Sequence, residues 1–242
     1  MNKAIFTIVK NERFFLDVWY KYYSQHFEQK DIYILNHDTT DGSIDKYRNL
    51  ANIIDLKHEI HFDHVWLRHV VESFQKELLD TYDVVCFTEV DEFIIPRNEL
   101  LSDYLESFAK SENQYVTCLG FELLDNCLYD PRKKILAQKT WFRANPRFMN
   151  KTLITKIPLS YEKGFHSHSQ PDNLDHNLIN LHLHYFDYIV FMERVKSRII
   201  HSDKFEHGVD GVQNKYKTME SYFQDFQINQ GVDSYLDLPK VI

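Results

Sequence analysis

The segment VVCFTEVDEFIIP, residues 84–96, combines an apolar strand pattern with three carboxylates at the end of that strand. Its first four residues have the apolar, β-branched composition of a buried strand, and Glu89, Asp91 and Glu92 follow before the apolar run FIIP begins. Buried strands gain no stability from carboxylates at their ends, because removing a charge from water is costly. We therefore interpret this turn as part of a functional site at the end of a core strand.

Short apolar segments alternate with amphipathic ones through roughly the first ninety residues. Strands are expected at residues 4–9, 31–36, 53–56 and 84–87, with helices beginning near residues 14 and 65. This alternation predicts a parallel sheet with helices on both faces, and such sheets bind ligands at the carboxyl ends of their strands. Polar side chains follow the first two strands, namely Asn11, Glu12, Asp38 and Asp41. Three separate segments are thus expected to meet at one edge of the sheet.

Beyond Pro96 the alternation fades, and the second half has a mixed α+β character. Strands are expected at residues 115–121, 151–157 and 178–185, and an amphipathic helix at residues 190–200. No repeat or Pro/Gly-rich linker separates the halves. We therefore predict a single α/β domain over residues 1–242, with halves at 1–100 and 101–242.

Bulk composition narrows the class of protein. The 28 basic residues against 36 acidic ones give a net charge of −8, which disfavours nucleic acid as a partner. Three cysteines lie far apart without C-x-x-C spacing, as expected of reduced thiols in the cytoplasm. No segment approaches the roughly 18 apolar residues of a membrane span. The sequence predicts a cytoplasmic protein, and peripheral attachment to the inner face of a membrane is compatible with it.

Glu89 and Asp91 stand two residues apart, so in an extended segment both carboxylates project from the same side. That arrangement suits a hard divalent cation such as Mg²⁺ or Mn²⁺. The alternative is a capping cluster, in which Asp91 or Glu92 accepts backbone N–H groups of the next turn. The segment HDTTDGS, residues 37–43, is typical of a solvated turn, although its place after a strand also allows Asp38 to contact a nucleoside.

Histidines occur in two H-x-H pairs, His166 with His168 and His182 with His184. In a strand, the two imidazoles of a pair share a face. His184 ends an apolar run, which makes it a candidate metal ligand or phosphate contact, and a Zn²⁺ site for hydrolysis remains an alternative use of these histidines. The signatures of P-loop, dinucleotide-binding and serine-hydrolase sites are missing from the sequence.

The ordered segments IVKNE (8–12), DIYILNHDTTDGS (31–43), VVCFTEVDEFIIP (84–96), NKTLI (150–154) and LHLHYFDYIVFMERVKSR (181–198) resemble the family-2-like glycosyltransferases with a D-x-D-E-F motif and the related family 92 enzymes. The resemblance implies the GT-A fold, a Rossmann-like sheet that binds a nucleotide-sugar with Mn²⁺ or Mg²⁺. It implies sugar transfer from a donor, expected to be a UDP-sugar, to a glycan or lipid-linked acceptor. Residues 1–100 would then bind the nucleotide, and residues 101–242 would form the acceptor side.

The same resemblance assigns roles to individual residues. Asp91 matches the metal-binding aspartate, and Glu89 stands where the family more often has aspartate. The implied metal set is Glu89, Asp91 and His184, and the implied nucleotide-sugar contacts are Asn11, Glu12, Asp38, Asp41, Lys151 and Lys196. An inverting enzyme also needs a carboxylate near the acceptor hydroxyl. The catalytic candidates are therefore Asp91, Glu122 and Asp125, with Glu122 favoured as the base.

Two other functions are compatible with the sequence. A nucleotidyltransferase uses a similar sheet, but it usually has a Gly-rich basic loop after its first strand, where IVKNERFF has no glycine. A catalytically silent nucleotide- or sugar-binding module is the other, and Glu89 in place of aspartate is the feature that points to it.

Overall fold

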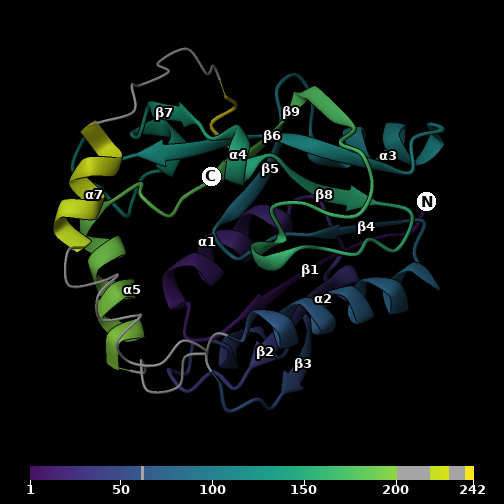
Figure 1. Ribbon diagram of the computed structural model, residues 1–242, viewed down its shortest axis with the longest axis horizontal. Coiled ribbons are helices and arrows are strands. Elements are labelled where there is room, and N and C mark those ends of the chain that lie inside the picture. Colours follow the sequence, from purple (N-terminus) through teal and green to yellow (C-terminus); the bar gives the residue numbers. More distant parts are fainter. Residues whose placement is uncertain (61–62, 201–218, 229–237) are drawn as a thin grey trace.

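The computed structural model describes residues 1–60, 63–200, 219–228 and 238–242, which are built around a nine-stranded sheet (Figure 1). The strands are β1 (Lys3–Val9), β2 (Ile32–His37), β3 (Asn52–Leu56), β4 (Val84–Phe87), β5 (Glu92–Pro96), β6 (Tyr115–Leu124), β7 (Trp141–Ala144), β8 (Lys151–Thr155) and β9 (Leu174–His182). The helices are α1 (Arg13–Tyr23), α2 (His64–Leu79), α3 (Leu101–Lys110), α4 (Pro146–Met149), α5 (Tyr188–Ile200) and α7 (Met219–Ile228). In space the strand order is β3-β2-β1-β4-β8-β6-β9-β5, with β7 paired to β6.

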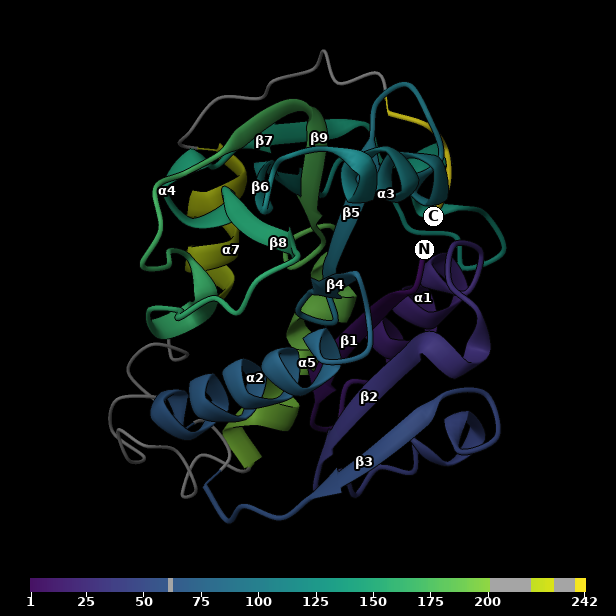
Figure 2. The same ribbon diagram turned by 90° about the vertical axis from the view of Figure 1, so that its right-hand side faces the viewer.

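The first half forms a parallel sheet, as its alternating pattern predicts. Strands β3, β2, β1 and β4 run parallel to one another. On β4, Val84 and Cys86 pack into the core that α1 covers, whereas Val85 and Phe87 pack into the core under α2. Figure 2 shows α1 and α2 on opposite sides of these strands. The predicted α/β class, with helices on both faces of the sheet, is confirmed.

The second half joins this sheet through antiparallel pairs, in agreement with its mixed pattern. Strand β8 pairs antiparallel with β4, β6 pairs antiparallel with β8, and β9 runs parallel to β6. The run FIIP, which follows the carboxylates, is part of strand β5, which pairs antiparallel with β9. In this register Glu92 lies opposite His182, so β9 carries its histidine to the carboxylate turn.

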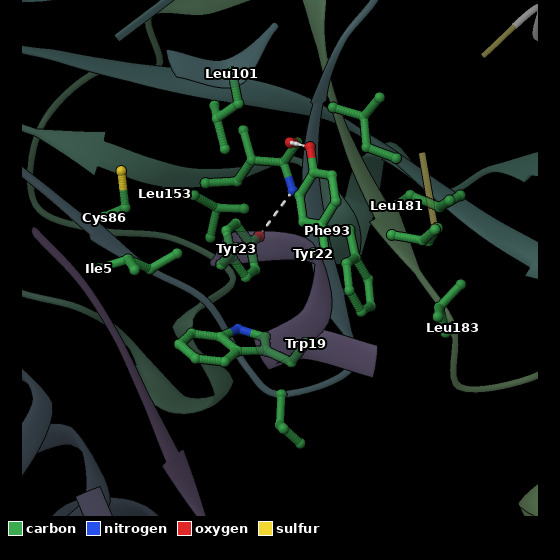
Figure 3. Close-up of a cluster of buried hydrophobic side chains, with 14 of the residues drawn as sticks. Ile5, Trp19, Tyr22, Tyr23, Cys86, Phe93, Leu101, Leu153, Leu181 and Leu183 are labelled. Atoms are coloured by element: carbon green, nitrogen blue, oxygen red, sulfur yellow. Dashed lines mark hydrogen bonds between the residues drawn. The ribbon is translucent and has the colours of Figure 1, made fainter. Parts of the chain in front are cut away.

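Helix α1 fixes the turn between β4 and β5 with side chains that are buried against it. The indole Nε1 of Trp19 donates to Oγ1 of Thr88 over 2.8 Å. The Tyr22 hydroxyl donates to the carbonyl of Ile94, and the Tyr23 hydroxyl accepts from the Ile94 amide (Figure 3). Buried polar groups of this kind are costly to leave unpaired. These aromatic side chains of α1 thus set the position of the carboxylate turn.

A close contact between β6 and α4 positions the start of β8. A Cβ atom on Gly120 would lie 2.1 Å from the carbonyl carbon of Met149, so only glycine allows this approach. The Gly120 amide donates to Oδ1 of Asn150 over 2.8 Å. This contact places Lys151 at the beginning of β8, beside the carboxylate turn.

Within the described residues, every helix falls short of the length and apolar character needed to cross a bilayer.

Candidate metal and nucleotide site

Charged side chains from both halves of the chain meet where β1 and β4 end. Glu12 follows β1, Asp91 lies between β4 and β5, and Arg194 projects from α5. Arg194 binds both carboxylates: its Nε lies 2.9 Å from Oε1 of Glu12, and its Nη1 contacts Oδ2 of Asp91. Glu12 and Asp91 were both expected at this edge of the sheet, and the guanidinium joins them.

Asp91, His182 and His184 form the one group in the described part of the chain with donor atoms placed as metal ligands. Oδ2 of Asp91 lies 3.3 Å from Nε2 of His182 and 3.6 Å from Nδ1 of His184. The two imidazole rings stack, with their centroids 5.5 Å apart and their planes at 8°. Imidazole ligands suit transition metals such as Zn²⁺ or Fe²⁺ and carboxylate ligands suit Mn²⁺, so this mixed set fits a divalent transition metal.

Glu122 fixes the ring of His182. Its Oε2 lies 2.7 Å from Nδ1 of His182, and its Oε1 accepts from Nδ2 of Asn145 over 3.1 Å. Metal-binding histidines commonly present one nitrogen to the ion while the other is held by a carboxylate. Here Nδ1 is held by Glu122, which leaves Nε2 facing Asp91. The donor atoms therefore fit a bound metal, and the hydrogen bond between Glu122 and His182 orients one of them toward it.

The ionisation of these groups follows from burial and from their neighbours. Burial would raise the pKa of Asp91, but the charges of Arg194 and His182 hold that pKa well below its usual value. Burial would lower the pKa of His182, but Glu122 and Asp91 raise it well above its usual value. Burial lowers the pKa of His184 to about 4, so this imidazole is neutral at pH 7. A neutral His184 accepts the 2.9 Å hydrogen bond from Nη1 of Arg194 through Nδ1.

Lys151 is buried between the other two carboxylates of the turn. Its Nζ lies 2.6 Å from Oε2 of Glu89 and 2.6 Å from Oε1 of Glu92. Burial would lower the pKa of Lys151, but these two carboxylates raise it above its usual value. Glu89 and Asp91, which the sequence places on one side of an extended segment, therefore have different partners. Glu89 is outside the group of donor atoms formed by Asp91, His182 and His184.

The turns after β1 and β2 come together, as expected from the sequence. Asn11 has a positive φ of 56°, and its Oδ1 accepts from the backbone amides of Thr40 and Asp41 at 2.8 and 3.3 Å. Asp38 also has a positive φ, of 52°, and its side chain is exposed at the end of β2. Asp41 caps its own turn by accepting from the amide of Ser43. Asn11 therefore ties the two turns together, and Asp38 presents a carboxylate at this edge.

Two predicted residues lie elsewhere. Asp125 binds Nζ of Lys139 over 2.5 Å and accepts from the backbone amide of Tyr188, so it belongs to an ion-pair cluster at the start of α5. Lys196 is exposed on α5. Two residues along a helix correspond to a rotation of about 200°, so Lys196 points away from the face that Arg194 presents to Asp91.

The site also contains two residues that the sequence interpretation did not assign, His182 and Arg194. The H-x-H spacing already placed His182 on the same face as His184, so a signal for it was present. For Arg194 the sequence offered only a basic residue on a predicted amphipathic helix. Its role depends on the rotation of α5 about its axis, which local sequence does not fix.

No protein-family model matches the sequence, and a comparison with curated proteins gives no match. Among solved structures, mannosyltransferase PcManGT from Pyrobaculum calidifontis, in complex with GDP-Man and Mn²⁺, is 12% identical with a TM-score of 0.41, over 92% of this chain and 69% of that one. S. aureus TarS is 11% identical with a TM-score of 0.39, over 94% of this chain and 44% of that one. Glycosyltransferase GlyE from Streptococcus pneumoniae is 13% identical with a TM-score of 0.33, over 93% and 50%. This chain thus spans half or less of the last two. Similarity at this level does not assign an activity to this protein.

Proposed function

We propose that this protein is a metal-dependent glycosyltransferase of the GT-A kind, which transfers a sugar from a nucleotide-sugar to a glycan or lipid-linked acceptor. The observation that carries the proposal is the meeting of Asp91, His182 and His184 at the carboxyl end of β4, beside the turns that follow β1 and β2. A Rossmann-like sheet binds nucleotides at this edge. The resemblance of the segment around Asp91 to the glycosyltransferase motif supports the same function.

In this proposal Asp91, His182 and His184 hold Mn²⁺, which fits a donor set with two imidazoles better than Mg²⁺ does. A divalent ion at such a site supplies positive charge to the diphosphate that leaves when the glycosidic bond breaks. Asp91 is the residue on which this site depends, because both imidazoles and Arg194 converge on its Oδ2. His182 keeps its orientation through Glu122. Since both oxygens of Glu122 are hydrogen-bonded, we propose that it positions His182 in place of the general-base role expected from the sequence.

The nucleoside contacts come from the turns after β1 and β2. We propose that the exposed carboxylate of Asp38 accepts hydrogen bonds from the base or the ribose, with Asp41 beside it in the same turn. Asn11 preserves the shape of this edge through its bonds to the second turn. Glu89 keeps 40% of its side chain exposed while its Oε2 binds Lys151, and a ribose hydroxyl is the contact we propose for it.

Three residues that the sequence assigned to nucleotide-sugar binding or to catalysis do not have those roles in this proposal. Lys151, whose side chain is fully buried, neutralises Glu89 and Glu92 and so stabilises the turn without meeting the diphosphate. Arg194 replaces Lys196 as the basic residue of α5 at the donor site. Asp125 stabilises the start of α5 through Lys139.

We also propose a cellular compartment for the protein. Cys86, Cys118 and Cys127 are free thiols, which supports the predicted reducing, cytoplasmic compartment. The continuous sheet, which includes strands from residues 3 to 182, supports a single domain. The predicted division, with the nucleotide at residues 1–100 and the acceptor at residues 101–242, needs correction in this proposal, because His182, His184 and Arg194 of the second half belong to the donor site. Nucleic acid is not among the proposed partners, and attachment to the inner face of a membrane would suit a lipid-linked acceptor.

A thermal-shift panel tests the donor site. UDP-, GDP-, CMP- and dTDP-sugars are each added with Mn²⁺ and with EDTA, since a ligand that binds only the native state raises its apparent stability. We expect an Mn²⁺-dependent rise with one nucleotide class, UDP-sugars being tested first, and no rise in Asp91→Asn. Folded protein that responds to none of the donors would contradict the proposal.

A catalytically silent nucleotide-binding module is the second candidate, and the commitment of Glu89 to Lys151 favours it. Slow hydrolysis of the donor without acceptor distinguishes the two functions. Metal-dependent release of sugar from the bound nucleotide-sugar identifies an enzyme, whereas tight binding with an intact donor over hours identifies a silent module. The turn after β1, which lacks glycine, gives no support to a nucleotidyltransferase.

A further inference from the structure

The guanidinium of Arg194 engages two of the three side chains in the proposed metal site. Its Nη1 contacts Oδ2 of Asp91 and lies 2.9 Å from Nδ1 of His184. An arginine nitrogen can only donate, so these bonds use lone pairs on both acceptors. A metal ion bound by a neutral His184 would need the one lone pair that Nδ1 already uses, and at Oδ2 of Asp91 it would compete with the guanidinium for the same oxygen.

From this geometry we propose that Arg194 and a divalent metal ion are alternative occupants of Asp91 and His184. The ion binds when the guanidinium leaves these two acceptors, and the released guanidinium then contacts the diphosphate that arrives with the ion. This inference rests on the proposed function, and it adds a residue that both opposes the binding of metal alone and favours the binding of metal with nucleotide.

Electrostatics makes joint occupancy unfavourable. The side chains of Arg194 and Asp91 are only 11% and 5% exposed, so water screens their charges poorly. A divalent ion on the same carboxylate oxygen would stand in contact with a full positive charge. The guanidinium would be repelled by the ion, while the diphosphate would add negative charge that attracts both cations.

Arg194 has a second anchor that survives this exchange. Its Nε lies 2.9 Å from Oε1 of Glu12, and its guanidinium lies 4.6 Å from the ring centroid of Phe15. Neither partner belongs to the donor set of the metal. With Nε held at the end of β1, the terminal nitrogens remain beside the nucleotide edge, and their planar fork matches the oxygens of a phosphate.

The test compares Arg194→Gln with Lys196→Gln, which removes the same charge from an exposed position on the same helix. Binding of Mn²⁺ alone is followed by the EPR signal of the free ion, and binding of UDP is followed by calorimetry at saturating Mn²⁺. If Arg194 blocks the metal site in most molecules, the apparent affinity for Mn²⁺ is lower than the intrinsic affinity by the fraction of molecules whose site is open. We expect Arg194→Gln to bind Mn²⁺ alone about tenfold more tightly and UDP with Mn²⁺ about tenfold more weakly, each being about 1.4 kcal/mol. Lys196→Gln should match the wild type in both.

The opposite signs separate exchange from a structural role, which would weaken both ligands together. Unchanged or weaker Mn²⁺ binding by Arg194→Gln, with a wild type that binds Mn²⁺, overturns the exchange and leaves the proposed function standing. Failure of both proteins to bind Mn²⁺ overturns the metal site itself. Binding by Arg194→Gln alone supports the exchange.

A measurement on the wild type removes dependence on the folding of the variant. Guanidinium signals are followed by ¹⁵N NMR during titration with Zn²⁺, a diamagnetic ion that imidazole ligands bind, and the Arg194 signal is assigned through its connectivity to the backbone of the wild type. We expect the assigned signal to move as Zn²⁺ saturates the site, because its bonds to Asp91 and His184 are broken. A signal that stays unchanged at saturation overturns the proposal.

Discussion

Nδ1 of His182 lies 2.7 Å from Oε2 of Glu122, so a carboxylate on β6 determines which nitrogen of an imidazole on β9 faces Asp91. The substitution Glu122→Gln removes the charge that supports this ring. We expect it to weaken Mn²⁺ affinity by about 10- to 100-fold, the usual cost of losing an outer partner of a metal ligand. Free Mn²⁺ measured by EPR gives the affinity, and Glu106→Gln, exposed on α3, is the matched control. Equal affinity in both variants would contradict a positioning role.

Asp91→Asn should abolish metal binding, because the amide no longer supplies the anionic oxygen on which His182, His184 and Arg194 converge. It should also lower the free energy of unfolding by a few kcal/mol, since a buried guanidinium loses one of its carboxylates. Calorimetry with Mn²⁺ and urea unfolding measure the two effects. Glu92→Gln, one residue away and paired with Lys151, serves as the comparison and should retain Mn²⁺ affinity. Metal binding by Asp91→Asn at wild-type strength would remove Asp91 from the site.

Lys151→Met tests whether Lys151 stabilises the turn or contacts the diphosphate. Removal of the buried ammonium leaves Glu89 and Glu92 without their cation, and we expect the free energy of unfolding at pH 7 to fall by about 3–5 kcal/mol. The deficit should shrink as the pH falls from 7 to 5, because protonated carboxyls tolerate burial. Urea unfolding at both pH values provides the measurement.

A diphosphate contact predicts a different result for Lys151→Met. In that case the free energy of unfolding would change by less than about 1 kcal/mol, and nucleotide affinity would fall instead. The double variant Lys151→Met/Glu92→Gln is the control for charge, since it leaves one unpaired carboxylate in place of two. It should recover part of the lost stability.

His184 should make the metal-free protein sensitive to acid. Burial lowers its pKa from the ordinary 6.5 to about 4 in the folded state, so between these values the unfolded chain takes up a proton that the native chain does not. Stability is therefore lost as the pH falls through this window, by about 3 kcal/mol at most. The pKa of His182 is raised, so its contribution to the free energy of unfolding is fully present at every pH below its ordinary pKa of 6.5. It therefore does not offset the loss caused by His184.

Urea unfolding in EDTA from pH 7 to pH 4 measures this effect. The free energy of unfolding of the wild type should fall more steeply than that of His184→Asn, which cannot take up the proton. Parallel curves for the two proteins would show that His184 is not neutral in the native state at pH 5.

Local periodicity predicted the strands and helices of the first half, because burial on both faces of a parallel sheet leaves a strong apolar pattern. The missed elements have weaker or shorter signals. Helix α3 buries Leu101, Leu105 and Phe108 on one face, but with ten residues it is short and carries few apolar positions. Strand β7 has four residues, of which the two outer ones are exposed, so no period could be recognised.

Site residues that directly follow neighbouring strands could be predicted from the sequence. Site residues that are joined by the pairing of strands far apart in the chain could not. Glu12 and Asp91 follow neighbouring parallel strands, so their convergence followed from topology alone. His182 reaches Asp91 through the pairing of β5 with β9, in which Glu92 lies opposite His182. That register links residues about ninety positions apart, and no local pattern encodes it.

The hydrogen bond between Glu12 and Arg194 joins residues 182 positions apart, and this separation bears on how the protein is made. A ribosome releases Glu12, the carboxylate turn and β5 long before β9 and α5. During that interval β5 has no neighbour in the sheet, since β9 is its pairing partner. Contacts this distant slow folding and expose unpaired strands to aggregation. The ion pair that completes the site therefore cannot form until α5 has left the ribosome, and premature termination before α5 would leave a nascent chain without Arg194.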